Sequence, residues 1–425
     1  MSPKQRPDFY DRSSVPTGNL LANARKQALA RGLYDFPIID VDAHHREDTA
    51  SWQGLIPYIE DDAIRMFAED VTRRESAAGM MGLEIRWHSN SGRIVRPGVN
   101  GFADSLSDDG RDPLVRRTIW AMDEMAIDYT ILFPTAMLFL GLHPQPQVEA
   151  GLARAYSKWL TREILPQDER IKTMLYLPFN DPQAALRIVE DFSDDPAVVG
   201  FMVTSVRYKP VHSNEFAPIY AALQERNMPL AFHAAYNWND QSLSLLNKFI
   251  SAHALGFTTS NMVHLTNMLM NGIPERFPRL KLLWVESGLA WLPFMMQRLD
   301  NEYLMRTAEA PALTKLPSDY MRDMWYSSQP MERSAKQSVM EATFDIMDAE
   351  RTLLYSSDYP HWDFDAPSTI YDLPFLTEDA KRRILGGNAL DLFGFKAESS
   401  ATPPDDDATV TATEHGEPVA PPIGP

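Results

Sequence analysis

The chain has 425 residues, 44% of them hydrophobic, and its 58 acidic and 40 basic residues give a formal net charge of −18. This length allows one large core or two modest ones, but no apolar run reaches the roughly 18 residues that span a bilayer. The N-terminus has no apolar stretch typical of a secretory signal, so we expect a cytoplasmic protein. The acidic excess argues against a nucleic-acid partner. Because cysteine is absent, any metal must be held by imidazole and carboxylate groups.

The two ends of the chain differ from its middle in composition. Residues 1–36 resemble an arm, with one helix expected around residues 19–31. Residues 396–425 are poor in large apolar side chains and rich in Pro, Asp and Thr, which predicts disorder. An arm of this kind packs on a partner subunit or wraps its own domain. The first of these arrangements predicts a homo-oligomer, or a hetero-oligomer with a homologous subunit, and this is the assembly that we expect.

Between the two ends, short apolar runs alternate with helical patterns. Runs of this length and character predict strands that are buried on both faces. They are FPIIDVDAH, DYTILFPT, KTMLYLPF, VVGFMVTS, PLAFHAAY, KLLWVESG, DMWYSSQ and TLLYSSDYPH. The helical segments between them include PLVRRTIWAMDEMA and DPQAALRIVEDF, and several begin with Asp or Pro, as helix starts often do.

This alternation predicts a (β/α)8 TIM-type barrel over residues 37–395. A doubly wound open sheet is the structural alternative, but no G-x-G-x-x-G follows the first strand. Residues 51–112 fit no strand–helix unit, so they are predicted to form an insertion. Such an insertion serves as a lid over the barrel mouth or as a subunit contact.

The first predicted strand ends in side chains that bind metals. Asp42 and His44 lie two residues apart on one strand and therefore point to the same side. Glu47 lies just beyond the strand and can fold back as a third or bridging carboxylate, whereas His45 should face away. Judged by spacing alone, a strand end with solvated charges is an equal alternative.

Two later strands end in further candidate ligands. His233 closes the fifth strand and Asp358 the eighth, although each alone also fits a structural role: a core histidine, and a turn before Pro360. Because a barrel gathers these strand ends at one mouth, they predict a shared metal site. Its predicted ligands are Asp42, His44, Glu47, His233 and Asp358. Such ligands suit Zn, Mn or Fe; Zn is the first choice, with one or two ions.

The same strand ends supply the predicted catalytic groups, which are Asp358, His361 and His233. Asp358 would take or give a proton, and His361 would stabilise developing charge. The predicted substrate contacts are Glu286, Trp291, His253 and Asn237. For Glu286, metal ligation and a buried pair with an Arg are alternatives.

At these residues the chain resembles the amidohydrolase superfamily, in the amidohydrolase-2 branch that includes aminocarboxymuconate semialdehyde and resorcylate-type decarboxylases. The resemblance extends over residues 37–393 and rests on DVDAHHRE, MDEMAIDYTILFPT, NMPLAFH, IPERFPRLKLLWVESGLAWLP, SSDYPH and ILGGNALDLFGF. It implies a (β/α)8 barrel with a divalent metal at its C-terminal mouth. It also implies that Asp42, His44 and His233 are ligands and that Asp358 is a ligand or base.

The sequence departs from the family pattern at three places. The first strand has D-x-H where many relatives have H-x-H, Glu286 stands where hydrolytic relatives have His, and the fourth strand has no Lys to bridge two metals. These differences favour a mononuclear site, or a two-metal site that is bridged by Glu47.

Three functions are compatible with this site. The first is a metal-dependent enzyme that hydrolyses or non-oxidatively decarboxylates a small carboxylated substrate. The second is an oxygenase component with two Fe or Mn ions, and the third is a structural subunit paired with an active homologue. Metal content and O2 consumption distinguish the first two functions.

Overall fold

The computed structural model describes residues 17–73, 106, 108–204, 209–233, 235, 243–332 and 336–394. Residues 1–16, most of the predicted insertion and the predicted tail at 396–425 lie outside this part of the chain. None of the described helices combines the length and the apolar character needed to span a bilayer.

Within the described residues, eight strands form one parallel sheet in sequence order. The strands are β1 (Ile39–His45), β2 (Tyr129–Pro134), β3 (Ile171–Tyr176), β4 (Val198–Val203), β5 (Leu230–His233), β6 (Leu282–Val285), β7 (Trp325–Ser327) and β8 (Leu353–Leu354). Backbone hydrogen bonds join β1 to the end of β8 and the segment after it. The Val41 amide donates to Tyr355 O (3.0 Å), and the Asp358 amide donates to Asp42 O (2.6 Å). The predicted (β/α)8 barrel is thereby confirmed.

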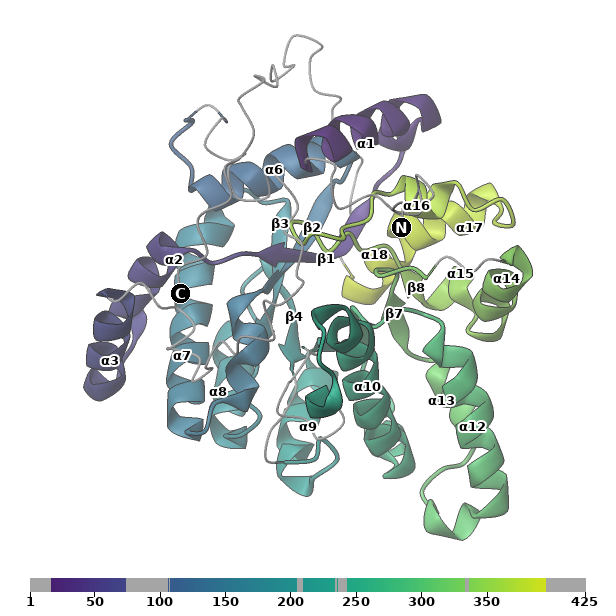
Figure 1. Ribbon diagram of the computed structural model, residues 1–425. Helices are drawn as coiled ribbons and strands as arrows, with labels where there is room; N and C mark the ends of the chain where they lie inside the picture. Colours follow the sequence, from purple (N-terminus) through teal and green to yellow (C-terminus); the bar gives the residue numbers. More distant parts are fainter. Residues whose placement is uncertain are drawn as a thin grey trace, which may run out of the picture.

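Helices surround the strands, as Figure 1 shows. They are α1 (Thr17–Arg31), α2 (Thr49–Leu55), α3 (Asp62–Arg73), α6 (Pro113–Met125), α7 (Pro146–Trp159), α8 (Pro182–Phe192), α9 (Ala217–Glu225), α10 (Phe249–Met270), α11 (Ile273–Arg276), α12 (Trp291–Met305), α13 (Pro317–Met321), α14 (Gln337–Ile346), α15 (Ala349–Thr352), α16 (Ser368–Tyr371), α17 (Glu378–Arg382) and α18 (Asn388–Phe393). The Asp112 and Asp181 side chains cap α6 and α8, each of which starts with Pro. The predicted Asp and Pro helix starts are confirmed at these two helices.

The helix of the N-terminal arm packs on its own barrel. Leu21, Ala24 and Ala28 on one side of α1 are buried, and the helix lies beside α6 and α16. At its C-terminal end, the Arg31 guanidinium donates to both carboxylate oxygens of Asp372, at 2.6 and 2.7 Å. Of the two arrangements expected for the arm, the described part therefore adopts the wrap around its own domain.

The strands of the barrel are largely buried, as predicted for a parallel sheet covered by helices, although β2, β3 and β7 each contain a partly exposed residue. Every residue of β1, β4, β5 and β6 is buried. Phe232 of β5 stacks on Trp284 of β6, with ring centroids 4.5 Å apart and an interplanar angle of 16°. Close packing of this kind fixes the direction in which each strand end leaves the sheet.

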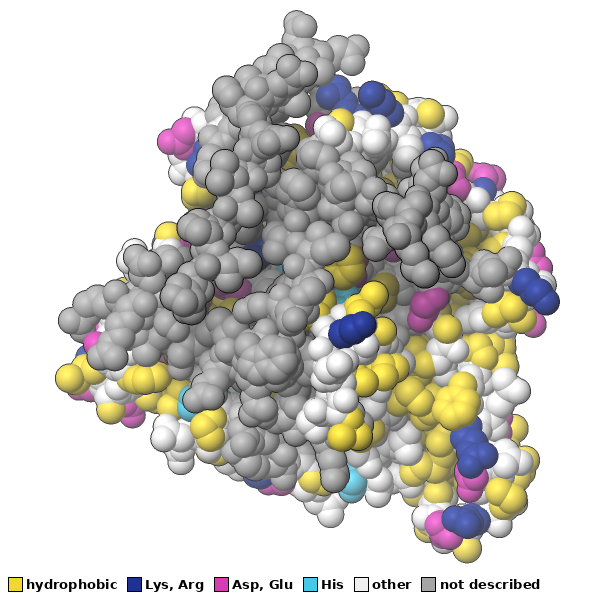
Figure 2. Space-filling model, viewed as in Figure 1, with side chains coloured by type: hydrophobic (Ala, Val, Ile, Leu, Met, Phe, Trp, Pro, Cys, Tyr) yellow, Lys and Arg dark blue, Asp and Glu magenta, His cyan; other side chains and the backbone are white. Residues whose placement is uncertain are grey.

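Part of the helical surface is apolar. α10 contains no Asp, Glu, Lys or Arg, and it exposes Ile250, Leu255 and Val263, while α12 exposes Phe294 and Leu304. Figure 2, drawn from the same side as Figure 1, shows hydrophobic side chains at the lower right, where Figure 1 places α12 and α13. Apolar surface of this kind is typical of contact areas. The oligomer expected from the sequence stays a prediction.

A glycine after β8 permits a close backbone approach between residues 383–387 and Pro37, which precedes β1. A Cβ at Gly386 would lie 2.1 Å from the carbonyl oxygen of Pro37, whereas a Cβ at the adjacent Gly387 would have no neighbour closer than 3.7 Å. We predict that Gly386→Ala lowers the free energy of unfolding by about 1–3 kcal/mol, the usual range for overpacking, and that Gly387→Ala does not. Thermal and denaturant unfolding measure the difference, and equal losses in the two variants would contradict it.

Candidate metal centre

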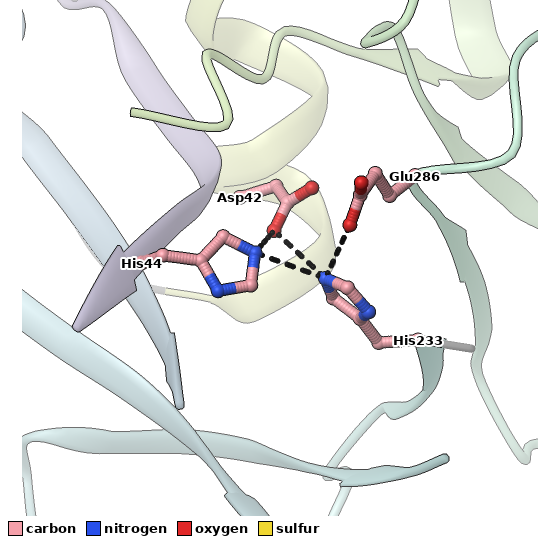
Figure 3. A group of neighbouring side chains, drawn as sticks. All are labelled: Asp42, His44, His233 and Glu286. Carbon is pink, nitrogen blue, oxygen red and sulfur yellow. Dashed lines mark hydrogen bonds and ion pairs between the residues drawn. The ribbon is translucent and has the colours of Figure 1, made fainter. Parts of the chain in front are cut away.

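Four buried side chains from three strand ends converge at the C-terminal mouth of the barrel, as Figure 3 shows. Asp42 and His44 come from β1, His233 from the end of β5, and Glu286 from the residue after β6. One potential ligand atom from each lies within 4.8 Å of the others. His44 Nε2 is 3.1 Å from His233 Nε2 and 3.4 Å from Asp42 Oδ1, and His233 Nε2 is 3.3 Å from Glu286 Oε2.

A second group overlaps the first. It consists of His44, Glu286, Asp358 and His361, again with one potential ligand atom from each within 4.8 Å of the others. Asp358 Oδ1 lies 3.3 Å from His44 Nε2 and 2.6 Å from His361 Nδ1. The structure therefore brings together four of the five predicted metal ligands, namely Asp42, His44, His233 and Asp358, and adds Glu286 and His361 to them.

The backbone holds two of the carboxylates in an unusual conformation. Glu286, the residue after β6, and Asp358, which lies in the segment after β8, have positive φ angles of 48° and 63°. A side chain other than glycine in this left-handed region costs on the order of 1–3 kcal/mol. Hydrogen bonds hold both turns: the Glu286 amide donates to Ser327 Oγ (3.0 Å), and the Asp358 amide donates to Asp42 O.

Several carboxylate oxygens of the centre are buried without a hydrogen-bond partner in the described part of the chain. They are both oxygens of Asp42, Oε2 of Glu286 and Oδ2 of Asp358. Buried carboxylate oxygens are costly unless a cation or hydrogen-bond donor compensates them. Since carboxylate and imidazole are the ligands of divalent Zn, Mn and Fe, the residues present fit a divalent metal ion.

The charges of the centre also favour a cation. Burial raises the pKa of the Glu286 and Asp358 carboxyls well above their usual range, and the neighbouring Asp42 raises both further. Burial also acts to raise the pKa of Asp42, but His233 and His44 outweigh it and hold that pKa below the usual range. Burial lowers the pKa of His361 well below its usual value, so this imidazole is neutral. Neutral imidazoles and crowded carboxylates are ready to bind a cation.

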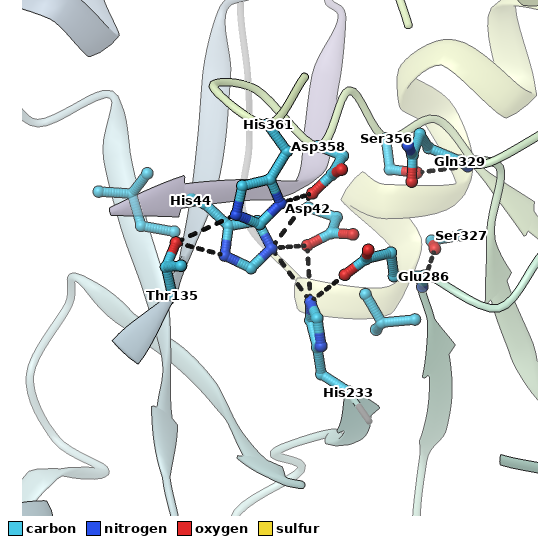
Figure 4. A network of polar contacts seen from close by, with 12 residues as sticks. Asp42, His44, Thr135, His233, Glu286, Ser327, Gln329, Ser356, Asp358 and His361 are labelled. Atoms are coloured by element: carbon cyan, nitrogen blue, oxygen red, sulfur yellow. Dashed lines mark hydrogen bonds and ion pairs between the residues drawn. The ribbon is translucent and has the colours of Figure 1, made fainter. Parts of the chain in front are cut away.

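Thr135, the residue after β2, connects two of the histidines (Figure 4). Its Oγ1 lies 3.3 Å from His44 Nδ1 and 3.2 Å from His361 Nε2. Because His44 Nε2 faces the other potential ligands, we assign the proton to its Nδ1, which then donates to Thr135. The Thr135 hydroxyl donates in turn to His361 Nε2, and His361 Nδ1–H donates to Asp358. This chain of hydrogen bonds orients both rings. The Thr135 position follows a predicted strand, but nothing in the sequence indicates its two partners.

Glu47 lies outside both groups. Its Oε1 accepts from the Tyr156 hydroxyl (2.7 Å) and its Oε2 from the Ala136 amide (3.0 Å), and burial raises its pKa to about 7. The structure does not bring Glu47 to the other predicted ligands. His45, as expected, faces away from them and packs against Trp159, with ring centroids 5.4 Å apart.

The predicted substrate contacts lie in different surroundings. His253 stands on α10 with Nε2 3.9 Å from Asp363 Oδ2 and its ring 5.5 Å from that of Trp362. Trp291 is buried at the start of α12, and its indole N–H donates to Gly288 O (2.9 Å). Asn237 lies outside the described residues, and Glu286 lies in both groups of potential metal ligands.

Asp40, a buried carboxylate next to the centre, was not among the site residues predicted from the sequence. Asp40 of β1 accepts hydrogen bonds from the Ser357 amide (2.8 Å) and the Asp42 amide (3.2 Å), and from the Ser357 hydroxyl. It therefore fixes the backbone on either side of two ligand candidates, while burial raises its pKa to about 7. The alternation of Asp40 and Asp42 on one strand was the available signal.

Comparison with known proteins agrees with this geometry. A family model described as amidohydrolase matches residues 39–395. The chain belongs to the amidohydrolase family. Membership in this family identifies it as an enzyme, a metal-dependent decarboxylase or hydrolase.

Several curated relatives are decarboxylases. The γ-resorcylate decarboxylase of Polaromonas sp. strain JS666 is 23% identical over 287 residues, which cover 65% of this chain and 86% of that protein. The 2-amino-3-carboxymuconate-6-semialdehyde decarboxylase of Dictyostelium discoideum is 20% identical, over 67% of this chain and 77% of that protein.

Solved structures share the fold. The 5-carboxyvanillate decarboxylase of Sphingomonas paucimobilis matches with a TM-score of 0.59 and 20% identity, over 85% of this chain and all of that one. A dihydroxybenzoic acid decarboxylase from Polaromonas sp. JS666, solved with bound manganese and the inhibitor 2-nitroresorcinol, matches with a TM-score of 0.59 and 17% identity, over 86% of this chain and 100% of that one.

The position of Glu47 leads to a direct test of its predicted ligand role. We predict that Glu47→Gln retains the metal content of the unmodified protein, because both carboxylate oxygens of Glu47 are taken by Tyr156 and Ala136. Elemental analysis of protein purified without chelators measures this, with circular dichroism to verify folding. A folded variant that has lost its metal would show that Glu47 is a ligand after all.

Proposed function

We propose that the protein is a metal-dependent decarboxylase that removes CO2, without oxidation, from a small carboxylated aromatic compound. The observation that carries the proposal is the buried Asp, Glu and His group at the barrel mouth, with carboxylate oxygens that lack hydrogen-bond partners among the described residues. The relatives add the substrate class, since several of them are named as decarboxylases of hydroxybenzoate-type acids.

Mn²⁺ is the ion that we propose. Zn was the first choice from composition, but the comparisons give no specific support for Zn. Three of the similar decarboxylase structures contain bound manganese. The centre also has three carboxylates among its potential ligands, and oxygen ligands suit Mn²⁺ well.

In this proposal Asp42, His44 and His233 hold the ion. Bound there, it would polarise and orient a carboxylate or hydroxyl oxygen of the substrate. Decarboxylation replaces a C–COO⁻ bond with a C–H bond and releases CO2, so the enzyme must deliver one proton to the ring carbon. The residues therefore have to hold a proton donor beside the bound substrate.

Asp358 is placed for this proton transfer. Its Oδ1 accepts from His361 Nδ1 (2.6 Å), while Oδ2 has no hydrogen-bond partner in the described part of the chain. We propose that Oδ2 gives the proton to the ring carbon. The side chain of His361 is 21% exposed, so it is the member of the pair through which a proton from solvent can return. Thr135 keeps the His361 ring in the required orientation.

Hydrolysis at the same centre is the alternative that the family allows. In hydrolysis a water molecule attacks the substrate as the nucleophile, whereas in decarboxylation a carboxylic acid gives a proton to the ring carbon. The similar proteins give no support to an oxygenase with two metal ions, and membership in an enzyme family argues against a purely structural subunit.

Two Asp→Asn variants test the proposal. Asp42→Asn should lose most of its bound metal and lower kcat/KM by at least about 100-fold, since it removes a ligand charge. Asp48→Asn serves as the control, because Asp48 lies on the same segment but caps α2. Release of CO2 from a panel of ortho-hydroxybenzoates by Mn²⁺-loaded protein measures the activity. Hydrolysis of esters, lactones or amides, with no CO2 released from any acid in the panel, would overturn the assignment.

A further inference from the structure

Gln329 is a buried side chain at the barrel mouth whose polar atoms have no partner. It lies two residues after the end of β7 and is 0% exposed. Neither its Nε2 nor its Oε1 has a hydrogen-bond partner among the described residues. A buried carboxamide without compensation opposes folding, because it has lost its hydrogen bonds to water. Gln329 is therefore a candidate for contact with a ligand.

Other buried amides in the described part of the chain serve the structure. The side-chain nitrogens of Asn180, Asn261 and Asn388 each donate to backbone carbonyl oxygens. In these three residues only the side-chain oxygen lacks a partner. At Gln329 both atoms lack one, so the conclusion is the same whichever way the amide group is turned.

The alternation of side chains along β7 directs Gln329 into the mouth of the barrel. Tyr326 faces the surrounding helices, where its ring lies 6.5 Å from that of Trp291 on α12. Ser327 lies on the opposite side, and its Oγ accepts from the Glu286 amide (3.0 Å). Because successive side chains of an extended segment point to opposite sides, Gln329 shares the inner side with Ser327. It thus faces the mouth in which the metal centre lies.

Hydrogen bonds before and after Gln329 fix its position (Figure 4). The Gln329 amide donates to Ser356 Oγ (2.8 Å), two residues before Asp358. Three residues further along the chain, the Glu332 carboxylate accepts from the Leu289 amide (2.8 Å), just before α12. The segment that carries Gln329 is therefore tied to the segments that follow β6 and β8. A side chain on so well fixed a segment loses little freedom when it binds a ligand.

We propose that the Gln329 carboxamide binds the substrate and recognises the hydroxyl and the carboxylate of an ortho-hydroxy acid together. Nε2 donates to a carboxylate oxygen, and Oε1 accepts from the hydroxyl. A carboxylate alone would leave Oε1 without a partner, because an ionised carboxylate only accepts hydrogen bonds. Gln329 belongs to neither group of potential metal ligands. The inference rests on the function proposed above and adds to it a residue that determines which acid is bound.

Isothermal titration calorimetry of the full-length, Mn²⁺-loaded protein tests the proposal with salicylate and benzoate, which differ only in the ortho-hydroxyl. Gln329→Met keeps the length of the side chain without its polar atoms, and Gln329→Glu replaces the donor by a second acceptor. Asn388→Leu is the matched control, because its buried amide donates to two backbone carbonyl oxygens, at 2.9 and 2.8 Å. Elemental analysis gives the metal content of each variant, and thermal unfolding without ligand gives its stability.

We expect the unmodified protein to bind salicylate more tightly than benzoate. Gln329→Met should weaken salicylate binding by about 10- to 100-fold, the usual effect of losing a hydrogen bond to a charged group. It should weaken benzoate binding less, so that the preference for salicylate falls. Gln329→Glu should weaken the binding of both acids further, since its carboxylate repels theirs. Metal content should not change in either variant.

Stability separates a ligand contact from a structural role. Without ligand, Gln329→Met should raise the unfolding temperature, because it removes a buried amide that lacks partners. Asn388→Leu should lower the unfolding temperature, because it leaves two buried carbonyl oxygens without their donor, and it should keep the preference for salicylate.

A folded Gln329→Met variant that prefers salicylate as strongly as the unmodified protein would rule out the inference. So would a fall in its unfolding temperature as large as that of Asn388→Leu, because Gln329 would then serve the structure. If the unmodified protein binds neither acid, the ortho-hydroxy acid is the wrong ligand and the inference falls. Failure of the proposed function alone looks different: the preference for salicylate would depend on Gln329 as expected, yet no acid tested would release CO2.

Discussion

Closure of the sheet between β1 and the segment after β8 is the constraint on which the centre depends. The Val41 amide donates to Tyr355 O, the Asp358 amide to Asp42 O, and the His44 amide to Tyr359 O. These bonds place the residues after β8 beside Asp42 and His44, although the two segments lie at opposite ends of the domain in sequence. Because Asp42 and His44 each take part in a closing backbone hydrogen bond, the contacts that close the barrel also place these two ligand candidates.

The electrostatic cost of that assembly is concentrated in a small volume. Three carboxylates converge with three imidazoles, and burial raises the pKa of two of those carboxyls. A fourth carboxyl, that of Asp40, lies beneath them with a raised pKa of its own. Such a group opposes folding unless a cation or protons neutralise it, so metal binding and stability must be coupled. The left-handed backbone at Glu286 and Asp358 adds to the free-energy cost of folding. Strained backbone of this kind is common at functional sites.

The sequence predicted the barrel and much of the centre because both depend on local patterns. Apolar runs buried on both faces predict parallel strands, and the alternation of side chains places Asp42 and His44 on one side and His45 on the other. Glu47 could not be placed in the same way. Its surroundings depend on Tyr156 of α7 and on the amide of Ala136 after β2, and no local pattern indicates these partners. Trp291 is a similar case, since its indole N–H is taken by Gly288 O within its own turn.

Glu47 and Glu286 show how surroundings decide the role of a residue type. Both are glutamates that follow a strand at the barrel mouth, and burial raises the pKa of each carboxyl. Glu47 accepts hydrogen bonds from a hydroxyl and from a backbone amide, so both of its carboxylate oxygens have a partner within the protein. Oε2 of Glu286 receives no hydrogen bond from the described residues and faces His233 instead. Hydrogen-bond donors satisfy the first carboxylate, whereas a cation is the compensation that suits the second. In related proteins, a buried carboxylate that lacks hydrogen-bond donors should therefore be a better candidate for a metal ligand than one chosen only by its spacing from the strand end.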